Sequence, residues 1–209
     1  MSAPLVLTLA NLKGGTAKTT SAVYLAHALV GMGRQVILLD ADPQGSALRW
    51  AGMADWPLPA AGLATATLHR QIWGVVDATR YDTVVIDTPP LEEAQGVVAS
   101  ALRVATAVVV PLAPTMMEVD RLGPVWRAIE DAAGNRDDDP AVGVLLTRTV
   151  PNAASTDAIR GLLVDQGRYV FDASVPRRER YAQAFGGEVP TNDDMYAPVA
   201  AELLSLVKP

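Results

Sequence analysis

The chain of 209 residues contains no cysteine and only two histidines, His27 and His69. It therefore cannot form a zinc site of thiolates or of cysteine and histidine, an iron–sulfur site, a disulfide framework or a cysteine nucleophile. Any catalysis must use oxygen and nitrogen groups.

Lysine is also scarce. Of 17 basic residues 14 are arginine, and the three lysines are Lys13, Lys18 and Lys208. With 23 acidic residues the net charge is −6, which argues against a uniformly positive surface. Contact with nucleic acid would therefore come from a local patch or from an assembled oligomer. Two of the three lysines lie within one short loop.

Long hydrophobic runs are absent. No apolar stretch approaches the roughly 18 to 20 residues that cross a bilayer, and the N-terminus lacks the basic start of a secretory signal. We therefore expect a cytoplasmic protein. The composition, 50% hydrophobic and 19% charged, is that of a folded core. The length predicts a single domain over residues 1–209.

Strand and helix patterns alternate along the chain. Continuous aliphatic runs, typical of parallel strands covered on both faces, predict strands at 4–10, 36–39, 83–86, 107–110 and 142–146, with another at 169–173. Apolar residues at helical spacing predict helices at 18–32, 67–79, 92–103, 115–134, 153–166 and 197–207. This order predicts an α/β fold with a mostly parallel central sheet between two helical layers.

Two segments read as exposed loops. The Trp56–Pro59 segment contains Pro57 and Pro59, and Asn135–Pro140 contains three consecutive aspartates. We interpret the acidic run as a solvated turn rather than a metal site.

A glycine-rich segment lies where the first strand should lead into the first helix. It reads Lys-Gly-Gly-Thr-Ala-Lys-Thr-Thr over residues 13–20. In such a loop, backbone N–H groups and the helix N-terminus converge on phosphate, Lys18 reaches the terminal phosphates, and the Thr19 hydroxyl can ligate Mg²⁺. The alternative is a glycine-rich turn before an ordinary helix.

With three further motifs, this segment resembles the deviant Walker A ATPases, and among them the short ParA-type partition ATPases without an N-terminal DNA-binding domain. The other motifs are Leu-Asp-Ala-Asp-Pro-Gln-Gly at 39–45, Asp-Thr-Pro-Pro at 87–90 and Val-Val-Pro-Leu-Ala-Pro at 109–114. The resemblance implies a three-layer P-loop NTPase fold that binds ATP and Mg²⁺. It assigns the phosphates to Gly14, Gly15, Thr16, Ala17, Lys18, Thr19 and Thr20.

The resemblance also implies roles for Lys13 and for three aspartates. Lys13 would reach the partner subunit's phosphates in an ATP-bound homodimer and neutralise charge there, unless it is an ordinary loop lysine. Asp42 would orient the attacking water, Asp87 would hold Mg²⁺ through water, and Asp40 would support the metal shell together with Thr19. Helix capping or turn formation is the alternative for these aspartates.

Ala17 departs from the family, which usually has glycine before the second lysine. If this position has a left-handed backbone, alanine costs roughly 1 kcal/mol there. We expect the fold to tolerate that strain. Nucleotide affinity and the rate of hydrolysis should be more sensitive to it.

The last third of the chain is locally basic. Residues 145–180 contain six arginines and four acids. By the resemblance, Arg177, Arg178 and Arg180 would bind nonspecific DNA in the dimer, with a solvated surface as the alternative. Pro176 and Arg177 would contact adenine, and Arg148 would edge the nucleotide pocket or simply lie at the surface.

Together these features predict a DNA-partitioning ATPase. It would dimerise around ATP·Mg²⁺, bind the nucleoid, and be reset by hydrolysis that a ParB-like centromere-binding protein stimulates. Two alternatives stay open: a MinD-like membrane-recruited ATPase, which would need a basic amphipathic helix that the C-terminal tail does not offer, and a weakly hydrolysing interaction module.

Overall fold

The computed structural model describes residues 3–134 and 138–207. One sheet contains seven strands in the order β3-β2-β4-β1-β5-β6-β7, and every pair in its described registers is parallel. The strands are β1 Leu5–Leu9, β2 Val36–Asp40, β3 Ala60–Gly62, β4 Thr83–Asp87, β5 Ala107–Leu112, β6 Ala141–Thr149 and β7 Val175–Pro176.

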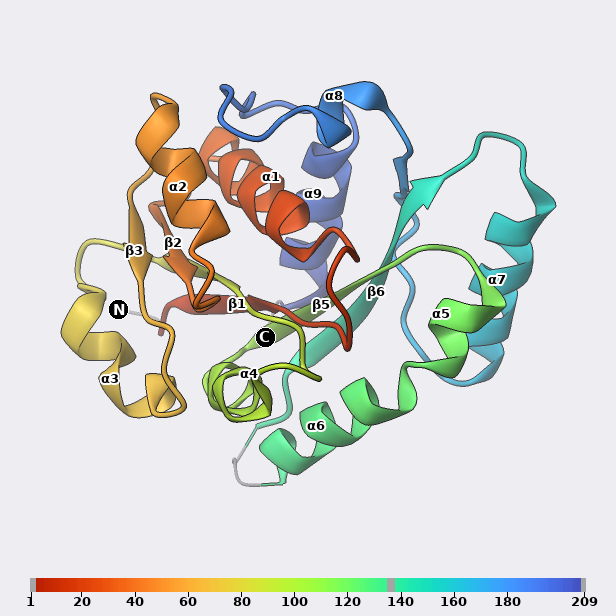
Figure 1. Ribbon diagram of the computed structural model, residues 1–209, viewed down its shortest axis with the longest axis horizontal. Helices are drawn as coiled ribbons and strands as arrows, with labels where there is room; N and C mark the ends of the chain where they lie inside the picture. The colour runs from red at the N-terminus through yellow and green to blue at the C-terminus, as the bar shows by residue number, and fades with distance from the viewer. Residues whose placement is uncertain (1–2, 135–137, 208–209) are drawn as a thin grey trace.

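Helices cover both faces of this sheet (Figure 1). One layer consists of α1 Lys18–Gly31, α2 Ser46–Met53 and α9 Tyr196–Leu206, and the other includes α3 Leu68–Val75, α4 Gln95–Leu102, α6 Gly123–Ala133 and α7 Ala154–Asp165. The short helices α5 Met116–Asp120 and α8 Glu179–Ala182 complete the fold. The predicted three-layer α/β architecture is confirmed.

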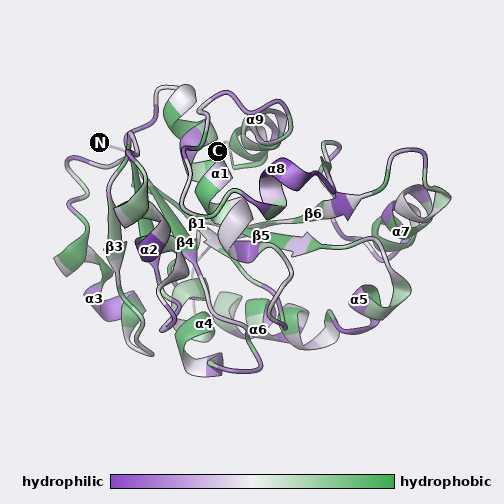
Figure 2. Ribbon diagram, turned by 45° about the horizontal axis from the view of Figure 1, so that its top comes forward, coloured by the Kyte–Doolittle hydropathy of each residue, from purple (hydrophilic) through white to green (hydrophobic). Residues whose placement is uncertain are grey.

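The central strands are buried throughout, as their aliphatic runs predict. β1, β2, β4 and β5 have no exposed residue, and their alternate side chains enter cores on opposite faces. Leu7 and Leu9 pack toward α1, whereas Val6 packs toward α3 and α4. Figure 2 shows green, apolar segments in the central strands. The carboxyl ends of β1, β2 and β4 therefore lie together on a rigid frame.

The predicted helix over 115–134 is wrong, because two helices occupy it. α5 ends at Asp120 and α6 begins at Gly123, next to Pro124. Proline cannot donate the backbone hydrogen bond that would continue the first helix. Met116 of α5 is 65% exposed, whereas Leu122 and Trp126 are buried.

The predicted strand at 169–173 is also wrong. Only an isolated bridge joins Val144 to Val170. Side chains satisfy the neighbouring backbone: Arg160 donates to the Phe171 and Asp172 carbonyls, and the Glu202 carboxylate accepts from the Asp172 amide. Because these groups are already paired, the segment does not extend the sheet, and the edge strand is the two-residue β7 instead.

Of the predicted loops, Trp56–Pro59 is only partly exposed. Leu58 is 5% exposed, and the Trp56 ring meets Trp50 and His27 edge-on at centroid distances of 5.9 and 5.0 Å. Of Asn135–Pro140, residues 135–137 lie outside the described residues, and Asp138 and Asp139 are exposed. Over residues 3–134 and 138–207, no helix has both the length and the apolarity to span a bilayer.

Candidate nucleotide site

The loop between β1 and α1 is anchored to two neighbouring strand ends. The Asn11 side-chain amide donates to the Pro111 carbonyl at 2.6 Å, and the Leu91 amide donates to the Asn11 carbonyl at 3.1 Å. Gly14 and Gly15 then lie exposed, with Gly15 at a φ of 72°. The anchored loop thus presents an open backbone at the carboxyl edge of the sheet, as a phosphate-binding loop requires.

Ala17 precedes α1 in a left-handed conformation, with φ 67° and ψ 23°. This is the condition under which alanine is strained where glycine would not be. No side chain caps the helix, so the N–H groups of its first turn stay available to a ligand.

Lys18 and Lys13 are placed differently. The Lys18 side chain is buried, 6% exposed, and its ammonium donates to the Lys13 carbonyl at 2.8 Å. Burial lowers the pKa of Lys18, while Asp87 and Asp42 oppose that change. The half-buried Lys13 contributes its carbonyl to the loop but does not line the cavity beside Lys18.

Asp87, at the end of β4, is a fully buried carboxyl group. Neither of its side-chain oxygens has a hydrogen-bond partner among the described residues. Burial raises its pKa to about 7, and the nearby Thr19 hydroxyl and Lys18 ammonium only partly oppose the rise. Such an oxygen pair is costly without a proton or a cation, so this position suits a metal ion or its bound water.

Asp40 and Asp42 organise the turn after β2. The two Asp40 carboxylate oxygens accept from the Asp42 and Leu48 amides, both at 3.0 Å, so the turn interpretation applies to this residue. Burial raises the Asp40 pKa, while the two amides lower it. Asp42 accepts from the Gln44 amide at 2.9 Å and stays partly exposed. Asp42 is therefore the more accessible of the two.

Lys18 and Asp42 line a cavity of about 290 Å³, whereas Asp40, Asp87 and Lys13 are not part of its lining. Its lining comes from the glycine-rich loop, the turn after β2 and the loop after β4, and consists of Gly14, Gly15, Ala17, Lys18, Thr19, Thr20, Asp42, Gln44, Thr88, Pro90, Glu93 and Arg148. The Thr88 hydroxyl donates to the Leu9 carbonyl at 2.6 Å and joins the ends of β4 and β1. Among the described residues, no three or more His, Cys, Asp or Glu side chains come together as a protein-only metal site.

A second, larger cavity of about 630 Å³ adjoins the first. Pro176, Arg177 and Arg178 line it together with Tyr181 and Tyr196. The two tyrosine rings meet edge-on at 5.6 Å, and the Tyr196 hydroxyl is 3.1 Å from the Ser21 hydroxyl. An aromatic, partly polar cavity beside a phosphate loop has the character of a nucleoside site.

The arginines predicted to bind DNA are not equally available. Arg178 pairs with Asp194 at 3.0 Å, and Arg180 pairs with Asp193 at 3.2 Å and also with Asp194. The Arg177 side chain is exposed and makes no ion pair among the described residues. Sequence reasoning missed these ion pairs because the two aspartates are over a dozen residues away in the chain.

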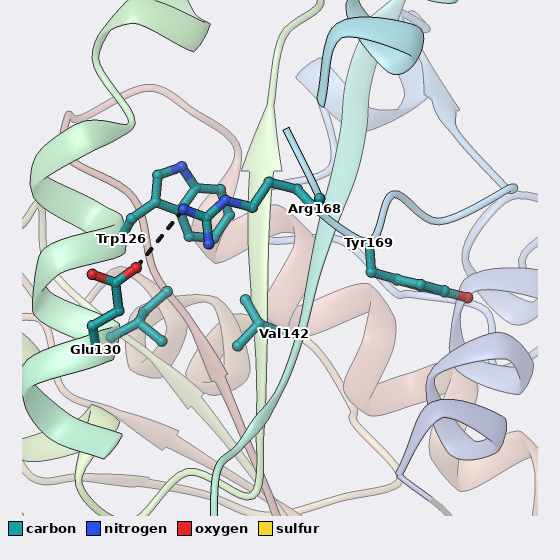
Figure 3. A pocket seen from close by; sticks show the side chains of 7 residues that line it. Trp126, Glu130, Val142, Arg168 and Tyr169 are labelled. Atoms are coloured by element: carbon teal, nitrogen blue, oxygen red, sulfur yellow. Dashed lines mark ion pairs between the residues drawn. The ribbon is translucent and has the colours of Figure 1, made fainter. Parts of the chain in front are cut away.

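Another hollow, of about 190 Å³, lies beside the start of β6, away from the glycine-rich loop. Figure 3 shows Arg168 lying over Trp126, with the guanidinium 4.2 Å from the ring centroid, and pairing with Glu130 at 3.8 Å. Tyr169 points away and donates to Glu202. The cation of this hollow is already engaged by an aromatic face and a carboxylate.

The sequence profile of the CobQ/CobB/MinD/ParA nucleotide-binding domain matches residues 7–190. The chain belongs to this nucleotide-binding family. Among its relatives are a carboxysome distribution protein A from Gloeobacter kilaueensis, 34% identical over 88% of this chain and 79% of that one, and the chromosome partitioning protein ParA of Caulobacter vibrioides, 28% identical over 96% and 94%.

Solved structures share the fold of this family member. Cobyrinic acid a,c-diamide synthase from Mycobacterium smegmatis, bound to an ATP analogue and magnesium, has a TM-score of 0.75 at 23% identity, covering 96% of this chain and 94% of that one. A plasmid partition protein of Borrelia burgdorferi bound to AMPPNP has a TM-score of 0.71 at 19% identity, covering 98% of both chains.

We predict that Ala17→Gly stabilises the protein. The substitution removes roughly 1–2 kcal/mol of backbone strain from the folded state. Glycine also gives the unfolded chain more conformational freedom, which offsets about 0.4–1 kcal/mol of that gain. The free energy of unfolding should rise by about 0.5–1 kcal/mol in urea titrations without nucleotide. The matched control is Ala201→Gly on the exposed side of α9, which should lose about as much. A loss of stability in Ala17→Gly would contradict the assigned strain.

We also predict that Asp87→Asn alters how stability depends on pH. The folded-state pKa lies above its ordinary value, so the stabilisation from protonated Asp87 is full below about pH 4 and is lost as the pH rises through about 7. Relative to the wild type, the free energy of unfolding of Asp87→Asn should increase by roughly 2–3 kcal/mol from pH 5 to pH 8.

Urea titrations at both pH values, without metal or nucleotide, measure this difference. Asp165→Asn, on the exposed surface of α7, reports the effect of the charge change alone. Parallel pH profiles for Asp87→Asn and wild type would rule out a buried, unpaired carboxyl group.

Proposed function

We propose that this chain is a ParA-type partition ATPase that binds ATP and Mg²⁺, dimerises around them, binds DNA nonspecifically in that state, and is released by hydrolysis. The observation that carries the proposal is the cavity in which the open glycine-rich backbone and Lys18 face the turn after β2 and the loop after β4. A triphosphate placed there gains amide donors, a helix N-terminus and a cation.

The chain's own residues suit Mg²⁺ at this position. The unpartnered oxygens of buried Asp87 and the hydroxyl of Thr19 offer the oxygen ligands that this ion prefers, directly or through water. When bound, the ion neutralises phosphate charge during phosphoryl transfer. Asp40 then supports the shell by fixing the turn, and the more accessible Asp42 orients the attacking water.

The placement of Lys13 supports a role in a second subunit. Its side chain does not line the cavity of its own chain, whereas that of Lys18 does. In a dimer whose subunits face each other across these cavities, Lys13 would bring a cation to the partner's phosphates, as an arginine supplied in trans does in other NTPases.

The same sheet edge carries exposed apolar side chains. Met116 and Met117 on α5, which follows the carboxyl end of β5, are 65% and 63% exposed. Large apolar side chains left in solvent mark interaction surfaces when they cluster beside a site. We assign this pair to the dimer interface.

The two relatives bear on the cargo. One is a chromosome partitioning protein and the other a carboxysome distribution protein, so both position large cargo. We infer that this chain likewise positions a large cargo on nucleoid DNA, with a ParB-like or equivalent partner stimulating hydrolysis. The membrane alternative is not favoured, because the apolar residues Val199, Ala200 and Leu203 of α9 are buried in the core.

We predict that the two loop lysines separate binding from turnover. Lys18→Gln should abolish measurable ADP binding, because it removes the ammonium that lines the cavity at the start of α1. Lys13→Gln should leave ADP affinity within about threefold but lower ATP turnover by roughly 10³-fold and abolish the ATP-dependent dimer. Calorimetry, phosphate release, and light scattering after size exclusion measure the three effects.

The two variants are matched controls, since each replaces a lysine of the same loop with glutamine. Equal losses of ADP affinity would contradict the assignment of Lys13 to the partner's site. A dimer that forms without nucleotide, or that persists in Lys13→Gln, would contradict the proposed sandwich.

We predict that DNA binding requires ATP and is restrained by Asp194. Anisotropy with a random-sequence duplex should show binding with a non-hydrolysable ATP analogue, and none with ADP or without nucleotide. Arg178 pairs only with Asp194, whereas Arg180 also pairs with Asp193, so Asp194→Asn should free Arg178, tighten binding and make the slope of log K against log salt steeper by about 1.

Asp165→Asn is the control, because it removes the same charge from an exposed position on α7. Equal effects of the two substitutions would assign the change to net charge rather than to the arginines. Binding that is indifferent to nucleotide would contradict the proposed function itself.

A further inference from the structure

Arg148, near the end of β6, has an unusual backbone for its residue type. Its φ is 55°, in the left-handed region that favours glycine. At the same point the pairing of β6 with β7 shifts register, between Thr147 and Thr149. An irregularity of this kind turns one side chain away from the direction that a regular strand would give it, and strained positions cluster at ligand sites.

The Arg148 side chain lies where the two cavities meet. The cavity beside Lys18 and the larger one beside Tyr181 share three lining residues, which are Ala17, Thr20 and Arg148. Ala17 and Thr20 belong to the start of α1, so Arg148 faces the helix N-terminus across the junction. It is the only charged residue of the three.

The guanidinium of Arg148 is uncommitted within the described part of the chain. The residue is exposed and makes no ion pair or side-chain hydrogen bond there. By contrast, Arg160 donates to backbone carbonyls and Arg180 pairs with two aspartates. No contact of the Arg148 side chain within the described residues explains why its backbone is strained.

We propose that Arg148 is a nucleotide-positioning residue that binds the phosphate next to the ribose. A nucleotide with its base in the larger cavity and its terminal phosphates beside Lys18 must pass its first phosphate through this junction. The planar guanidinium donates two parallel hydrogen bonds to phosphate oxygens, and the start of α1 adds donors from the opposite side. This inference rests on the proposed ATP binding and adds a contact from β6.

Arg148→Gly tests it, because glycine removes the guanidinium and also relieves the backbone. We expect the affinities for Mg²⁺·ADP and for a non-hydrolysable Mg²⁺·ATP analogue to fall by the same factor, about tenfold or more. The melting temperature without nucleotide should be unchanged or higher. Calorimetry and thermal denaturation of the full chain measure both effects.

The matched control is Asn152→Gly. Asn152 is another exposed residue at positive φ, 60°, but it lines neither cavity. It should gain stability without losing affinity. Arg148→Gln, which keeps most of the side-chain volume, should lose affinity as Arg148→Gly does, and it serves as the test if the glycine variant does not fold.

ADP affinity within twofold of wild type in the folded variants would overturn the proposal. A loss confined to the ATP analogue would also overturn it, because the contact would then be to the terminal phosphate. If the wild-type chain bound neither nucleotide, the proposed function would fail, and that result is distinguishable from a failure of Arg148 alone.

Discussion

The site depends on burying a carboxylate and an ammonium at one edge of the sheet. Asp87 and Lys18 lie close enough to affect each other's pKa, yet burial dominates for both. Lys18 is held by a backbone carbonyl rather than by a carboxylate, and Asp87 has no hydrogen-bond partner among the described residues. A buried pair left in this state is a poor source of stability, and it is the arrangement that the proposed binding of phosphate and a cation would require.

The rest of the fold holds those two groups in place. β1 and β4 are paired in register from Leu5 and Thr83 to Leu9 and Asp87, so the strand that leads into the glycine-rich loop is adjacent to the strand that ends in the carboxylate. The Thr88 hydroxyl joins the two ends, and Asn11 anchors the loop to β5. The groups that would bind a ligand are therefore held in place before it arrives, and the stability of the sheet offsets the cost of holding them there.

The sequence predicts the framework well because the strongest signals are local. Buried parallel strands require continuous aliphatic runs, and the loop requires glycines and lysines at fixed spacing, so these features could be located without coordinates. The wrong strand and the unforeseen ion pairs occur where residues distant in the sequence make the contacts. The Phe171 backbone is satisfied by Arg160 of another element, and Arg180 is paired by Asp193, so neither the absent strand nor the engaged arginine has a local signal.

Backbone strain is concentrated at the two cavities beside the glycine-rich loop. Three residues other than glycine have positive φ in the described chain, and two of them, Ala17 and Arg148, line the junction between the cavities. Their neighbours in sequence differ, and one begins a helix while the other interrupts a strand. What they share is their position at the junction. Since each would be more relaxed as glycine, the sheet and α1 must hold them in these conformations, and the strain falls where the chain would surround a nucleotide.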